Sequence, residues 1–92
     1  MDSAPYKNMK ETLERELESL RVTREELRLQ ATLAHADIQK EWYDLETRFG
    51  LAQEELARLA AHTKAATHEA VQQAHALIDE LKAGYERIRR AA

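Results

Sequence analysis

Residues that interrupt helices are almost absent from this chain. Its 92 residues include one proline, Pro5, and two glycines, Gly50 and Gly84. Strand-forming residues are also scarce, because Val and Ile together number only five. A β sandwich or barrel needs a turn about every ten residues, and this composition cannot supply those turns. The chain is therefore predicted to be all-α.

Apolar or small residues recur along the chain at alternating steps of four and three, which is the pattern of amphipathic helices that pack through a seam. Arg24 is the charged exception in the first series, and after Ile38 an extra step of four shifts the phase. A second series of apolar residues follows this shift from Trp42 onward, and a third lies in the C-terminal third of the chain. The predicted interaction seam consists of Leu13, Leu17, Leu20, Leu27, Ala31, Ala34, Ile38, Trp42, Leu45, Phe49, Leu56, Leu77, Leu81, Tyr85 and Ile88.

Asn8, followed three residues later by Glu11, has the form of a capping box and predicts a helix start. We therefore expect a disordered N-terminal segment, residues 1–7, and a single helical domain, residues 8–92. A turn is predicted at 62–68, because this stretch has no large apolar residue. The alternative turn is at Gly50, which precedes an apolar residue as helix-ending glycines often do.

A turn at 62–68 predicts an antiparallel hairpin of long amphipathic helices, the first about 80 Å long at 1.5 Å per residue. The return helix would bring Leu81 to Leu45 and Tyr85 to Trp42. The segment from Asn8 to Ala34 would project beyond the hairpin with its leucine stripe in water, and such a stripe is typical of a partner-binding surface. We therefore expect a homodimer that forms a coiled coil or four-helix bundle, with another helical protein as the second candidate partner.

Charge and hydropathy exclude several classes of partner. Lys and Arg number 14 against 17 acidic residues, a net charge of −3, which has the wrong sign for binding nucleic acid. No stretch reaches the roughly 20 apolar residues that a transmembrane helix needs. The N-terminus lacks the apolar run of a signal peptide, so we expect a cytoplasmic protein without a transmembrane segment. The absence of Cys excludes thiolate chemistry and disulfides.

The residues that carry chemistry in enzymes are not grouped in any known catalytic pattern. Ser3 and Ser19 have no surrounding His and Asp pattern, and no glycine-rich loop is present to hold a phosphate. We predict no enzymatic activity, no catalytic residues and no cofactor.

Three of the four histidines, His62, His68 and His75, are candidates for a metal or haem site. Two-ligand helical sites use spacings of three or four residues, whereas these histidines are six and seven residues apart. Solvated helix histidines are therefore the favoured interpretation, and metal or haem binding through these residues is an alternative.

Three of the five aromatic residues, Trp42, Tyr43 and Phe49, fall within eight residues. Trp42 and Phe49 match the seam spacing, which favours core positions, and the alternative is a binding hot spot. Arg24 is predicted either to extend its guanidinium outward to water or to fix the register by pairing with an acid of a second chain.

Segment 57–76 contains eight alanines and only three charged residues. Helices with such smooth, weakly apolar surfaces can rest on lipid, so reversible lipid or surface binding is a second alternative function.

Two short stretches, Glu-Trp-Tyr-Asp-Leu-Glu at 41–46 and Gly-Tyr-Glu-Arg-Ile-Arg at 84–89, resemble small uncharacterised bacterial long-helix proteins. The resemblance implies a helical fold and brings no activity or functional residues. The function predicted from the sequence is a non-enzymatic, homo-oligomeric coiled-coil scaffold or adaptor that acts through helix–helix interaction.

Overall fold

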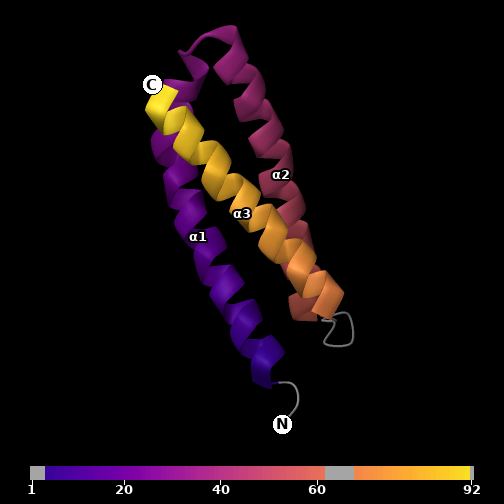
Figure 1. The fold of residues 1–92 in the computed structure, drawn as a ribbon. Coiled ribbons are helices and arrows are strands. Elements are labelled where there is room, and N and C mark those ends of the chain that lie inside the picture. Colours follow the sequence, from indigo (N-terminus) through magenta and orange to yellow (C-terminus); the bar gives the residue numbers. More distant parts are fainter. Residues whose placement is uncertain (1–3, 62–67, 92) are drawn as a thin grey trace.

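The computed structural model describes residues 4–61 and 68–91, with side chains from residue 9 onward, and its regular structure is entirely α-helical. Helix α1 spans Ala4–Thr32, α2 spans Ala36–Ala61 and α3 spans His68–Ala91. The prediction of an all-α fold is therefore confirmed. The helices lie side by side and run alternately up, down and up, so that the chain enters at one end of the bundle and leaves at the other (Figure 1). The bundle measures 49 × 17 × 17 Å.

The core lies along the bundle axis and is built from the apolar stripe of each helix. Heptad spacing keeps these side chains on the inward face of their helices, which explains why α1, α2 and α3 bury one stripe each. The buried apolar residues are Leu13, Leu17, Leu20, Leu27, Ala31, Trp42, Leu45, Phe49, Ala52, Leu56, Leu59, Val71, Ala74, Ile78, Leu81, Tyr85 and Ile88. One chain thus buries its own seam without a second copy.

The first helix is shorter than the sequence predicts, because a turn at residues 33–35 separates α1 from α2. At the end of α1, the Leu33 amide donates to the Leu29 carbonyl at 3.1 Å. The His35 carbonyl then accepts from the amides of Ile38 and Gln39, each at 3.0 Å, and so begins α2. Gln39 Nε2 also donates to the Thr32 carbonyl at 2.8 Å, satisfying an acceptor at the end of α1.

This turn corrects the expected two-helix hairpin with a projecting arm. Segment Asn8 to Ala34 does not extend alone into water, because α1 folds back along α2 and α3 of the same chain (Figure 1). The phase shift after Ile38 does not lie within one long helix. It instead follows a change of helix, since each new helix sets its own phase.

Two other boundaries differ from the prediction. Helix α1 begins at Ala4, so Asn8 lies inside the helix rather than capping it, and residues 4–7 of the expected disordered segment are helical. The alternative turn at Gly50 is wrong, because α2 continues through this residue to Ala61. Most of the predicted turn at 62–68 lies outside the described residues, and its last residue, His68, begins α3.

Helices α2 and α3 pack antiparallel and closely (Figure 1). The rings of Trp42 and Tyr85 lie 5.9 Å apart between centroids and are tilted by 44°, so the predicted meeting of these two residues is found. At Gly84, a Cβ atom would lie 2.9 Å from Leu45 Cδ1 and 3.0 Å from its Cγ. The missing side chain therefore lets α3 approach α2 at this level.

Candidate interaction groove

A polar cluster joins α1 to α2 at the edge of the core. Arg24 Nε donates to Glu46 Oε1 at 2.6 Å, and Arg24 Nη2 donates to Glu46 Oε2 at 2.7 Å. The guanidinium carbon also lies 5.1 Å from the centroid of the Phe49 ring, within cation–π distance. The hydrogen bond to Glu46 raises the pKa of Arg24 above its usual range. The acid that Arg24 meets thus comes from its own chain and not from a second copy.

Tyr85 contributes a buried hydroxyl beside this cluster. Its side chain is almost fully buried, and the hydroxyl finds no hydrogen-bond partner among the described residues. Burial raises the pKa of Tyr85 to about 12, with a further rise from the negative charge of Glu46. The phenol therefore stays neutral at physiological pH.

The two interfaces made by α3 are each bridged by ion pairs. Lys82 Nζ lies 2.9 Å from Glu16 Oε1 across the α1–α3 interface. Arg87 Nε lies 2.5 Å from Glu41 Oε1 across the α2–α3 interface, and Arg48 Nε lies 3.3 Å from Glu80 Oε2 there. The stems of such long side chains can shield apolar surface beside an interface from water.

The α1–α2 interface is more open. The two helices pack less closely against each other than against α3. Among the described residues, Arg24–Glu46 is the ion pair that crosses between them. Two hollows of about 360 and 330 Å³ follow one another along this interface and share Arg21 as a lining residue. Together they form the α1–α2 groove.

Small residues of α2 line the groove. Gly50 lines one hollow, and Ala57 and Ala60 line the other, with Gln53 between them in the sequence. These four positions follow one another at steps of three, four and three, so they occupy one face of α2. Nothing lies within 4 Å of the Cβ position at Gly50. The groove therefore has room along α2 for side chains from outside the bundle.

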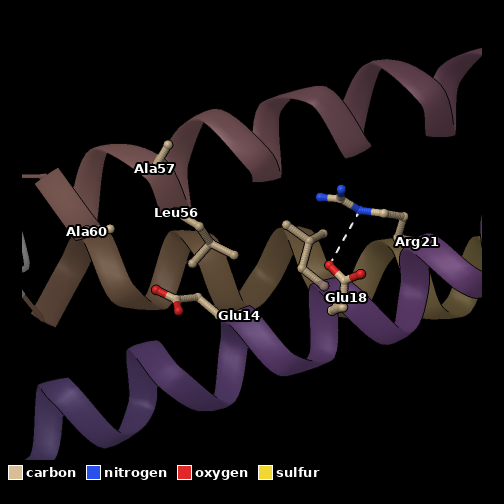
Figure 2. Close-up of a pocket in the computed structure, with 7 residues that line it drawn as sticks. Glu14, Glu18, Arg21, Leu56, Ala57 and Ala60 are labelled. Carbon is tan, nitrogen blue, oxygen red and sulfur yellow. Dashed lines mark ion pairs between the residues drawn. The ribbon is translucent and has the colours of Figure 1, made fainter.

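Charged residues of α1 form the opposite wall. Glu14, Glu18 and Arg21 belong to α1 on one side of the hollow, and Leu56, Ala57 and Ala60 belong to α2 on the other side (Figure 2). Arg21 Nε pairs with Glu18 Oε2 at 3.6 Å. Glu14 forms no ion pair with another described residue, and its carboxylate lies beside Leu56 in this view (Figure 2). The wall thus presents a free negative charge next to an apolar floor.

Two exposed apolar side chains continue the groove at the end nearer the α1–α2 turn. Tyr43 precedes Gly50 by seven residues and Leu29 follows Glu25 by four, so each lies at the solvent-facing edge of the groove rather than inside a hollow. Their exposed fractions are 67% and 68%, high enough for contact with a partner. The pairing of Arg24 with Glu46 places Leu29 level with Glu41, within about one helical turn of Tyr43.

Most of the predicted seam is used inside the molecule. Ala34, Ile38 and Leu77 are only partly buried, whereas the other seam residues are buried in the core. Of the aromatic cluster, Trp42 and Phe49 are core residues and Tyr43 is exposed.

In α3, the choice of Leu77 as the seam position left out the large core residues Val71 and Ile78. The series Val71, Ala74, Ile78, Leu81, Tyr85 and Ile88 keeps a strict alternation of three and four. Preference for this regular spacing would have identified both residues.

The histidines are not brought together in the described part of the chain. His75 Nδ1 lies 3.1 Å from Asp79 Oδ2, and His68 lies 3.0 Å from Gln72 through its Nε2 atom, both pairs on the exposed surface of α3. His62 lies outside the described residues. Within residues 4–61 and 68–91, no three His, Cys, Asp or Glu side chains are grouped so that they could hold a metal ion.

The alanine-rich segment 57–76 is described only outside 62–67. Val71 and Ala74 within it face the core, so these apolar side chains are not on the surface. In the part of the chain that the structure describes, no helix has the length and apolar character required to cross a membrane.

Comparison with protein-family models, with curated proteins and with solved structures gave no match.

Proposed function

We propose that this protein is a non-enzymatic scaffold or adaptor that acts through helix–helix interaction, and that it receives a fourth helix in the α1–α2 groove. A bundle of four helices would follow, as the seam pattern predicts from the sequence. Association is the function, so no bond is made or broken and no cofactor is needed.

The observation that carries the proposal is the difference between the three interfaces. The α1–α2 interface is the least closely packed of the three, and its two hollows lie over Gly50, Ala57 and Ala60. The hollows between α1 and α3 are instead lined by charged residues of α3, among them Asp79, Lys82 and Glu86. Small residues on a helix permit close approach by another helix, and a docked helix would remove the remaining apolar surface from water.

The exposed leucine stripe from which the sequence predicts a homodimer is not found in the described part of the chain. The leucine stripe that required a second copy is buried in the core of one chain. Self-association would therefore have to use the groove, and a second copy is one of the occupants that the following experiment distinguishes.

Site-specific photo-crosslinking tests the proposal. A photoreactive amino acid at Ala57, inside the groove, is compared with the same amino acid at Ala83, an exposed residue of α3 that lines none of the hollows described above. In an extract of the source cells, we expect the position 57 variant to yield an adduct whose linked segment, sequenced by mass spectrometry, carries apolar residues at heptad spacing. Equal adducts from both positions, or none from position 57, would contradict groove docking.

A further inference from the structure

The shape of the groove indicates the size of the side chains that would fill it. Gly50 and Ala57 are seven residues apart on α2 and leave space above the helix in consecutive hollows. A partner helix carrying large apolar residues at heptad spacing would place one in each hollow. Tyr43 and Leu29 would then contact its next apolar residue.

The charge of the groove indicates the residues that flank this apolar stripe. The two hollows are lined by four carboxylates and two guanidinium groups, a net charge of −2 at pH 7: Glu14, Glu18, Glu25 and Glu46 against Arg21 and Arg24. Because Arg24 is held by Glu46 and Arg21 by Glu18, the carboxylate of Glu14 is left without a cation among the described residues. A Lys or Arg on the partner would complement it.

A second copy of this chain is a poor match for the same surface. Two exposed apolar residues of its α1, Val22 and Leu29, are flanked by Glu18, Glu25 and Glu26 at helical spacing. Docking these residues into another copy's groove would set acid against acid, and like charges at an interface disfavour association.

We propose that the α1–α2 groove binds a basic amphipathic helix of another protein, with bulky apolar residues at heptad spacing and Lys or Arg on the flank that meets Glu14. This inference rests on the proposed function, since it names the partner of the same groove. Size and charge are independent features of the partner, so each can be tested separately.

The test uses two fluorescently labelled synthetic helices of about three heptads with the same leucine stripe, one flanked by Lys and the other by Glu. Binding to the full chain is followed by fluorescence anisotropy at low and high salt. We expect the Lys peptide to bind at least about tenfold more tightly than the Glu peptide, and the difference to shrink at high salt.

Two pairs of variants locate the binding. Ala57→Leu fills a hollow and should weaken binding of the Lys peptide about tenfold. Ala83→Leu adds the same group at an exposed position of α3 and should leave this affinity unchanged. Glu14→Lys should weaken binding of the Lys peptide about fivefold and reduce its salt dependence, and Glu86→Lys, on α3, serves as the matched charge control. Circular dichroism verifies that each variant remains folded.

The outcomes separate this inference from the proposed function. Equal binding of the two peptides, with Ala57→Leu still weakening both, would overturn the basic partner and leave groove docking standing. If sedimentation shows a dimer of the chain and Ala57→Leu dissociates it, the basic partner is likewise overturned and groove docking still stands. If neither peptide binds and the chain alone stays monomeric, or if Ala57→Leu and Ala83→Leu behave alike, both proposals fail.

Discussion

At the scale of single residues, the two glycines have opposite surroundings although both lie inside helices. Nothing lies near the Cβ position of Gly50, whereas the corresponding position at Gly84 meets the buried side chain of Leu45. Helix propensity favours Ala over Gly by roughly 1 kcal/mol in both cases. Packing therefore determines whether an added side chain stabilises or destabilises the protein at each glycine.

Gly50→Ala should raise the free energy of unfolding by about 1 kcal/mol, because it gains helix propensity without a clash. Gly84→Ala should lower it by about 1 kcal/mol or more, since overpacking against Leu45 outweighs the same gain. Urea unfolding of the two variants and the parent measures both changes. Equal effects of the same sign at the two positions would contradict the close approach of α3 to α2.

The raised pKa of Tyr85 predicts a loss of stability at high pH. Its pKa is about 12 in the folded state against an ordinary value near 10, so the unfolded chain releases this proton first. The stabilising contribution is complete below pH 10 and is lost as the pH rises from 10 through 12, by up to about 2 to 3 kcal/mol.

Tyr85→Phe should remove this loss, and should also raise stability at neutral pH by about 1 kcal/mol, because the buried hydroxyl without a partner disappears. Tyr43→Phe, at an exposed position, is the matched control and should keep the parent's pH profile. Chemical unfolding at several pH values between 9 and 12 measures both variants. If Tyr85→Phe shows the same pH dependence of the free energy of unfolding as the parent, Tyr85 is not the source of the loss at high pH.

At the scale of elements, Arg24–Glu46 is the contact that fixes α1 against α2. Its two short hydrogen bonds and its position at the core edge distinguish it from exposed pairs such as Glu16–Lys82. Bidentate pairs of this kind are stronger than single exposed contacts, because the geometry is fixed and less solvent screens the charges.

A double-mutant cycle compares the two pairs. We expect Arg24→Met and Glu46→Gln to show a coupling energy of about 1 to 3 kcal/mol, and Lys82→Met with Glu16→Gln to stay below about 1 kcal/mol. Unfolding in urea gives each free energy. Equal coupling in the two cycles would mean that Arg24–Glu46 behaves as an ordinary surface pair.

The elements also show where sequence reasoning succeeds and where it fails. Heptad spacing identified Trp42, Phe49 and Tyr85 as core residues, because burial follows helical periodicity directly. The turn at 33–35 was missed because it contains neither Gly nor Pro, and no described residue has a positive φ angle. Its signals were the phase shift near Ile38 and Asp37 in the first turn of α2.

The groove was harder to foresee. Gly50, Ala57 and Ala60 have no distinctive pattern unless the position of α1 is known, because small residues serve equally well in cores, in turns and on surfaces. Arg24 was recognised as an exception to the seam, but its partner depended on the missed turn. The candidate site therefore follows from the tertiary fold, whereas the core follows from periodicity alone.

At the scale of the whole molecule, the core belongs to one chain. Unfolding of the isolated protein should therefore be independent of concentration, since mass action affects stability only when association is linked to folding. We expect one thermal midpoint from micromolar to near-millimolar protein and a monomer by sedimentation. A midpoint that rises with concentration would instead indicate that the chain folds together with a second copy.

Helices α1, α2 and α3 alternate in direction, so the polypeptide passes from one end of the bundle to the other (Figure 1). A tag or fused protein attached before Ala4 and another attached after Ala91 would therefore be held apart by a rod 49 Å long. The molecule is thus suited to serve as a spacer, and reporters joined to its two ends should report its length.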